Sequence, residues 1–173
     1  LAACRRLAHL LPGLSGERVA GEVLKILAAP DAPAIIAVMA EADVLVHILP
    51  EARAFGRLDA LIAVEGFGFG GDPVRRLGAL IEGGPAAAEA IATRLRLSND
   101  QRARLVGIVE TAPPIHACLD VCQARGILYR IGRERFRDRV VQAWANSIAR
   151  APATDEAGAW QALLAHAEAW QKV

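Results

Sequence analysis

Prolines and glycines divide this sequence into segments of helical length, and their spacing constrains the fold more than any other feature. Breakers stand at Pro12-Gly13, at Pro30, at Pro50, in the glycine-rich run 66–71 and at Pro113-Pro114. Between the breakers, apolar residues recur every three or four positions, which is the period of an amphipathic helix. Hydrophobic residues, largely alanine and leucine, make up 54% of the 173 residues, and aromatic residues only 5%. The sequence therefore predicts an all-α fold, a multi-helix array around a sizeable core.

Helix boundaries follow from capping residues as well as from breakers. Asp72 precedes Pro73 at a favoured first helical position, and Ser98 with Gln101 forms a Ser-x-x-Gln capping box. Pro113-Pro114 are expected to open a helix that Gly126 ends. Only residues 127–131 have a sequence that resembles a strand. The expected helices cover about 2–11, 15–29, 32–42, 58–65, a segment from 73, 85–96, a segment from 98, 113–126, 133–150 and 155–171.

Residues 13–27, GLSGERVAGEVLKIL, predict an amphipathic helix. Ser15 can cap its start. Its apolar residues recur at helical spacing, and its charged residues form a stripe on the opposite face. The apolar set is Val19, Val23, Ile26 and Leu27, and the charged set is Arg18, Glu22 and Lys25. An ordinary amphipathic helix could carry the same stripe.

The same segment resembles the neck of class II tRNA nucleotidyltransferases, the family of bacterial CCA-adding enzymes and poly(A) polymerases. Ser15, Glu17, Arg18 and Glu22 match its Ser-x-Glu-Arg-(Ile/Val)-x-x-Glu-(Leu/Val) pattern. Residues 44–52, 72–80 and 95–101 are similar to later segments of the family, in the same order. The resemblance implies neck helices over 1–50, body helices over 51–97 and tail helices over 98–173, behind a catalytic head and a base-selecting motif that this chain lacks.

The resemblance also implies a function in tRNA processing. The chain would bind tRNA and position it for 3′-end nucleotide addition by the N-terminal head, which uses Mg²⁺ with CTP or ATP. The expected partners are tRNA or other RNA and that head. The chain itself is expected to have no cofactor and no nucleotidyltransferase activity. The sequence does not distinguish CCA addition from poly(A) synthesis. The alternatives are a helical protein-interaction module and a purely structural fragment.

No catalytic or metal site is predicted. Residues 70–76, GGDPVRR, resemble the Gly-Gly-x-Val-Arg-Asp loop of nucleotidyltransferase heads, but no Asp-x-Asp pair exists to hold metal ions. The segment is instead expected to start a helix. The three cysteines, Cys4, Cys118 and Cys122, suggest reduced thiols. With His116, the last two supply only three ligands. We expect them to be buried on a helix.

The candidate RNA surface lies near the tail. Residues 125–139 contain six arginines and two acidic residues, a net charge of +4. Arginine suits phosphate because its planar guanidinium donates parallel hydrogen bonds. On the helix from Arg133, a polar stripe is expected beside the side formed by Phe136, Val140, Trp144 and Ile148. The stripe comprises Arg135, Arg139, Gln142, Asn146 and Arg150. The candidate RNA-binding residues are Arg130, Arg133, Arg135, Arg139 and Arg150; the alternative is a solvated helix face.

Charge and hydropathy bound the remaining possibilities. The net charge is only +1, so RNA binding must come from local clusters. No apolar run reaches the roughly 20 residues that span a bilayer, and no signal-peptide pattern is present, so we expect a cytoplasmic protein with no membrane partner. Trp144 is expected beside Phe136 in the core, as are Trp160 and Trp170. Phe67 and Phe69 are expected to cover a hydrophobic edge rather than touch a partner.

Overall fold

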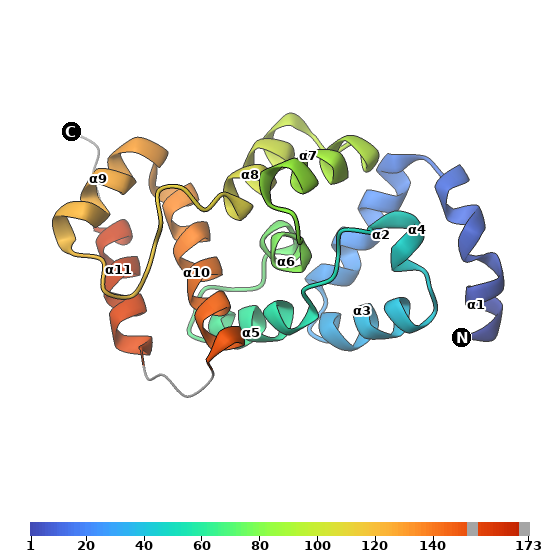
Figure 1. Cartoon of the computed structure of the whole chain (residues 1–173), viewed down its shortest axis with the longest axis horizontal. Helices are drawn as coiled ribbons and strands as arrows, with labels where there is room; N and C mark the ends of the chain where they lie inside the picture. Colours follow the sequence, from blue (N-terminus) through green and yellow to red (C-terminus); the bar gives the residue numbers. More distant parts are fainter. Residues whose placement is uncertain (152–155, 170–173) are drawn as a thin grey trace.

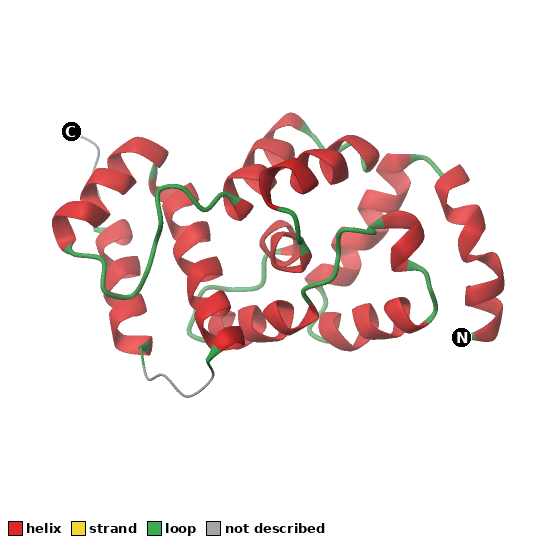
Figure 2. Cartoon of the chain, viewed as in Figure 1, coloured by secondary structure: helices red, strands yellow, loops and turns green. Residues whose placement is uncertain are grey.

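Helices and the loops between them account for the structure. It is a computed structural model that describes residues 1–151 and 156–169. These residues form eleven α-helices and one 3₁₀ helix, with no strand among them (Figure 2). An isolated antiparallel bridge joins Ala52 to Ile81. The predicted all-α fold is confirmed.

The helices form an elongated array, with α1 at one end, α6 near the middle, and α9 and α11 at the other end (Figure 1). The first elements are α1 (Ala2–Leu7), η1 (Ala8–Gly13), α2 (Gly16–Ala28), α3 (Ala32–Glu41), α4 (Leu45–Ile48) and α5 (Phe55–Glu65). The later ones are α6 (Pro73–Leu80), α7 (Gly84–Arg94), α8 (Asn99–Val109), α9 (Val121–Ile131), α10 (Arg133–Arg150) and α11 (Ala157–Glu168). None of the described helices is long and apolar enough to cross a membrane.

The predicted caps are confirmed. The Ser15 hydroxyl accepts from the Arg18 N–H at 3.4 Å at the start of α2. An Asp72 carboxylate oxygen accepts from the Arg75 N–H at 2.9 Å at the start of α6. Ser98 and Gln101 form both bonds of the capping box of α8. Each cap satisfies an N–H that has no partner within its helix.

The prediction of a helix over residues 113–126 is wrong at both ends. Residues 110–120 form a loop, and α9 begins after Asp120, whose side chain forms a capping box with Gln123. The helix continues through Gly126 and ends before Gly132, which has a φ of 80°. Glycine is favoured where φ is positive, so Gly132 is the residue that separates α9 from α10. The strand-like residues 127–131 are therefore helical.

The first helix also differs from expectation, and the bounds predicted for the last one are not tested. The first α-helix ends at Leu7, and the chain continues as a 3₁₀ helix with Pro12 inside it. The last helix is described as Ala157–Glu168, and the predicted ends at Asp155 and Gln171 lie outside the described residues.

Two hydrophobic clusters form the core, and α5 and α6 contribute to both. Leu58 and Leu77 belong to the cluster built mainly from α2 to α8. Leu61 and Ala79 belong to the cluster with α9, α10 and α11. The helices α5 and α6 therefore join the two halves of the array.

The aromatic residues that were expected in the core, as far as the structure describes them, are buried in the second cluster. Phe136, Trp144 and Trp160 are buried there. The rings of Phe67 and Phe69 lie 4.9 and 6.2 Å from the Trp144 ring, which confirms that these loop residues cover a hydrophobic edge. Trp170 lies outside the described residues.

Candidate nucleic-acid interface

The segment that resembles a neck motif holds α2 against the end of α7. A Cβ on Gly16 would lie 2.4 Å from the Arg94 carbonyl oxygen, so the backbones approach closely. Glu17 accepts from Arg96 at 3.0 Å, and hydrogen bonding lowers the pKa of this carboxyl. Glu22 pairs with Lys25 at 2.8 Å. These contacts are structural and involve exposed side chains.

The predicted faces of α2 are confirmed. Arg18, Glu22 and Lys25 are exposed, whereas Val23 and Leu27 are buried. Val19 and Ile26 are half-buried against the first cluster. Arg18 makes no ion pair with any residue that the structure describes, so its charge faces solvent.

The predicted stripe on α10 is interrupted. Arg135 and Arg150 are exposed, but Arg139 is only 4% exposed, so its predicted solvent-facing position is wrong. Its guanidinium donates to the carbonyl oxygens of Ala112, at 3.0 Å, and Pro113. The loop 110–120 lies over this side of α10, and helical spacing alone cannot reveal such a cover. Arg139 therefore holds the loop 110–120 against α10 through these hydrogen bonds.

The structure leaves Arg130, Arg133 and Arg135 exposed around the α9–α10 junction. We call them the junction arginines. Arg130 Nε donates to the Gly126 carbonyl oxygen at 3.3 Å. None of the three makes an ion pair with a described residue. Arg150 stands roughly 22 Å further along α10 than Arg135, given about 1.5 Å of rise per residue, so it does not belong to this group.

A glycine in α8 allows Arg135 to pack across that helix. A Cβ on Gly107 would lie 2.7 Å from Arg135 Nε and 3.1 Å from its Cδ. The stem of Arg135 is thereby supported, while the residue remains exposed. Long basic side chains often pack their stems in this way and keep the charge in water.

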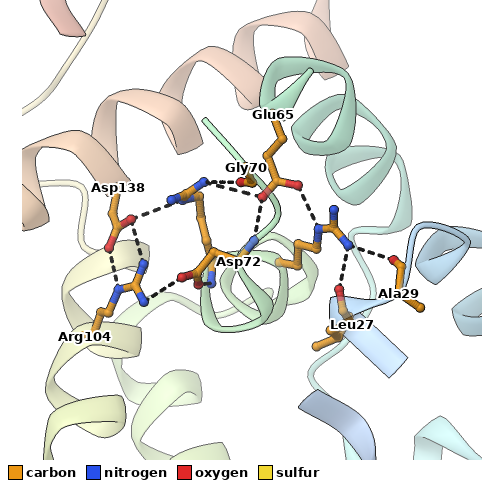
Figure 3. Close-up of polar contacts among 9 residues, drawn as sticks. Leu27, Ala29, Glu65, Gly70, Asp72, Arg104 and Asp138 are labelled. Atoms are coloured by element: carbon orange, nitrogen blue, oxygen red, sulfur yellow. Dashed lines mark hydrogen bonds and ion pairs between the residues drawn. The ribbon is translucent and has the colours of Figure 1, made fainter. Parts of the chain in front are cut away.

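A buried group of charges that was not predicted from the sequence lies at the centre of the molecule (Figure 3). Four of its side chains are almost fully buried, and Asp72 and Arg104 are partly exposed. The group contains three arginines and three carboxylates, so it has no net formal charge. We call it the central ion network, and its members are Glu65, Asp72, Arg75, Arg76, Arg104 and Asp138.

One half of the central ion network joins α6, α8 and α10. Asp138 accepts from Arg104 Nε at 2.8 Å and Nη2 at 3.0 Å, a two-pronged pair, and from Arg75 Nε at 3.1 Å. Arg104 Nη1 also donates to Asp72 at 2.8 Å. Hydrogen bonding to Asp138 raises the pKa of Arg104.

The other half ties the end of α2 to α5 and α6. Arg76 Nε donates to Glu65 at 2.8 Å, and its Nη1 donates to the carbonyl oxygens of Leu27 and Ala29 at 2.7 and 2.8 Å (Figure 3). These carbonyls lie at the C-terminus of α2, where no intrahelical partner remains. Glu65 also accepts from the Asp72 N–H at 3.2 Å. Arg76 therefore caps one helix while neutralising a buried carboxylate.

These contacts explain the glycine-rich segment before α6. Asp72 is the helix cap, Arg75 and Arg76 each donate hydrogen bonds through Nε and Nη1, and a Cβ on Gly71 would lie 2.6 Å from Arg76 Nη2. The segment starts a helix, as predicted from Pro73. The sequence carried a partial signal, because Arg75 and Arg76 are the only charged residues of an otherwise apolar helix. In the structure every residue from Val74 to Leu80 is buried, so both arginines need partners.

Cys118 and Cys122 are not buried as predicted. Cys4, Cys118 and Cys122 are all free and exposed, and Cys118 lies in the loop before α9. The prediction that Cys118 and Cys122 are buried is therefore wrong. Cys118 lies in the loop that replaces the first turns of the expected helix, and Cys122 is helical but exposed in the first turn of α9. Within the described ranges, no group of three or more His, Cys, Asp or Glu residues is arranged to hold a metal ion.

A comparison with protein families finds a match for the first part of the chain. Residues 1–55, which span α1 to α4, match the family described as "Probable RNA and SrmB- binding site of polymerase A". The match supports an RNA-binding region of the polymerase A type in this segment and RNA as a partner. No curated protein matches the chain.

Proposed function

We propose that this chain is the RNA-binding part of a class II nucleotidyltransferase that positions tRNA for addition of nucleotides to its 3′ end. The match of residues 1–55 to the polymerase A RNA-binding region carries the proposal. In this proposal a separate catalytic head would add the nucleotides, using Mg²⁺ and CTP or ATP. The whole enzyme would be cytoplasmic. The same arrangement would serve poly(A) synthesis on other RNAs.

The junction arginines are the proposed phosphate contacts. Arg130, Arg133 and Arg135 are exposed and have no carboxylate partner among the described residues. Some other exposed arginines are already paired, as Arg102 is with Glu89. Arg18 and Arg150 also lack an ion pair with a described residue, but Arg18 stands on α2 and Arg150 at the far end of α10, outside this cluster. Double-stranded RNA is recognised mainly through its backbone and shape, so a cluster of unpaired arginines can dock an arm of tRNA without reading its bases.

The arginine contacts can be tested by binding fluorescently labelled tRNA to the full chain at several salt concentrations. Changing both Arg133 and Arg135 to Ala should weaken binding, because two phosphate contacts are lost. The slope of log affinity against log salt should flatten by roughly one unit for each lost contact. Different tRNAs should lose affinity equally, since backbone contacts carry no base information.

Arg102→Ala is the matched control, because Arg102 is also exposed but is paired with Glu89. It should change the salt slope much less. If the double variant kept the affinity and slope of the wild type, the junction would be an ordinary solvated surface. The protein-interaction module would then be the better proposal.

A further inference from the structure

A groove of about 760 Å³ lies where α10 faces the turn between α6 and α7. Its walls also include part of the loop 110–120 and Trp160 of α11. The polar residues used in the argument below are Arg57, Gln142, Asn146, Arg150 and Trp160, all of which line the groove. Neither the phosphate contacts proposed above nor the central ion network uses them.

Buried polar atoms without partners concentrate at this groove. They are the Gln142 and Asn146 amide oxygens, the Trp160 indole nitrogen and Arg57 Nε. Gln142 is 6% exposed and Trp160 is 3% exposed. The remaining such atom in the described ranges, Arg137 Nε, lies outside the groove lining. Native proteins rarely leave such atoms unpaired, and those that remain often mark functional sites.

One part of the groove favours an anion. Burial lowers the pKa of Arg57, Glu82 raises it, and the charge of Arg150 lowers it, so Arg57 interacts with a carboxylate as well as with a second guanidinium. Arg57 Nη2 also donates to the Ile81 carbonyl oxygen. Arg150 makes no ion pair with any described residue. The turn at Gly83-Gly84, which opens the eleven-residue helix α7, also lines the groove, and a helix N-terminus attracts anions.

The overall charge of the groove limits the size of that anion. Three arginines and three glutamates line it, so the formal charges cancel. Arg139 is already held by the loop carbonyls, and Glu156 accepts a hydrogen bond from Ser147. Such a lining suits a single phosphodiester charge better than a triphosphate.

We propose that this groove holds one unpaired nucleotide of the bound RNA. Its phosphate would lie near Arg57, Arg150 and the N-terminus of α7, and its base would meet Gln142, Asn146 and Trp160. Two amide acceptors and an indole donor complement a base that carries an amino group beside a ring nitrogen. That description fits adenine or cytosine and does not fit uracil. The inference rests on the proposed RNA-binding function.

The test compares a blunt RNA hairpin with the same hairpin carrying a three-nucleotide 3′ overhang of A, C or U. Binding of each to the full chain is measured by fluorescence anisotropy. The A and C overhangs should raise affinity by about tenfold over the blunt hairpin, since each hydrogen bond contributes roughly two- to tenfold. The U overhang should add less.

Two variants separate the groove from the rest of the RNA surface. Gln142→Leu and Trp160→Phe should each remove most of the overhang gain and leave binding to the blunt hairpin unchanged. Gln142→Leu should also raise the melting temperature, because it removes a buried amide without a partner. A residue with only a structural role would not combine higher stability with lower affinity. Circular dichroism is used to check that each variant is folded. If Gln142→Leu does not fold, the loss of the overhang gain in Trp160→Phe alone tests the proposal.

The outcomes distinguish the two proposals. If the blunt hairpin binds but no overhang adds affinity, the groove proposal fails and RNA binding stands. Equal gains from all three overhangs would show that the groove takes the backbone alone, which overturns the assignment of a base to Gln142, Asn146 and Trp160. If neither RNA binds, the proposed function itself fails.

Discussion

The surroundings of each arginine determine its role in this protein. Arg76 is buried among a carboxylate and two carbonyl oxygens. Arg102 forms an exposed pair with Glu89, and Arg133 is exposed without any ion pair among the described residues. Removing one member of a buried ion pair leaves an uncompensated charge in the interior. Removing one member of an exposed pair costs little, because water already screens the charges.

Removing the charge of Arg76 should therefore be among the most destabilising single changes in the chain. Arg76→Met keeps much of the side-chain volume but leaves Glu65 and two carbonyls of α2 short of donors. It should lower the free energy of unfolding by about 3–5 kcal/mol, measured by urea titration. Arg102→Met is the control and should cost less than about 1 kcal/mol. Equal small losses in both variants would show that Arg75 and the Asp72 N–H suffice for Glu65.

At the scale of the helices, the sequence predicted what is local and missed what depends on tertiary packing. Caps such as Ser15 and Asp72 were predictable because the capping side chain and the backbone N–H that donates to it lie three residues apart. The burial of Arg139 was not, because the covering loop is 27 residues away in sequence. The central ion network was missed for the same reason, since Arg75 and Asp138 are separated by 63 positions.

Helix packing makes two glycines respond oppositely to the same substitution. A Cβ on Gly78 would lie 2.5 Å from Ile108 Cγ2, where α6 packs on α8, whereas a Cβ on Gly21 would meet nothing within 4 Å. Gly78→Ala should destabilise the protein by about 1–3 kcal/mol through overpacking. Gly21→Ala should stabilise it by about 0.5–1 kcal/mol, because alanine favours the exposed helix. Thermal unfolding measures both, and a stabilising Gly78→Ala would mean that α6 and α8 pack less closely.

At the scale of the whole molecule, the central ion network crosses between the two hydrophobic clusters. Arg76 reaches the end of α2 on one side, and Asp138 lies on α10 on the other. The network has equal numbers of positive and negative groups, so protonation of Asp72 leaves excess positive charge inside the array. The free energy of unfolding of the chain should therefore depend on pH in the acidic range.

Two carboxyls determine the sign of this dependence. Burial acts to raise the pKa of Asp72, but the Arg75 N–H and Arg104 outweigh it, so the pKa is lowered. Hydrogen bonding to Arg94 lowers the pKa of Glu51. A carboxyl with a lowered folded pKa contributes stability above its unfolded pKa, about 3.9 for Asp and 4.3 for Glu, and this is lost as the pH falls through the folded value.

The free energy of unfolding should accordingly fall when the pH is lowered below about 4. Asp72→Asn keeps an oxygen that can cap α6 but removes the charge that faces Arg104. It should cost about 1–2 kcal/mol at pH 7 and make the loss between pH 5 and pH 3 shallower than in the wild type. Denaturant titrations across this range measure both effects. In an Arg104→Met background, Asp72→Asn should alter the acid dependence less, because the charge has lost a partner. Identical acid profiles for Asp72→Asn and the wild type would show that the Asp72–Arg104 pair does not stabilise the array.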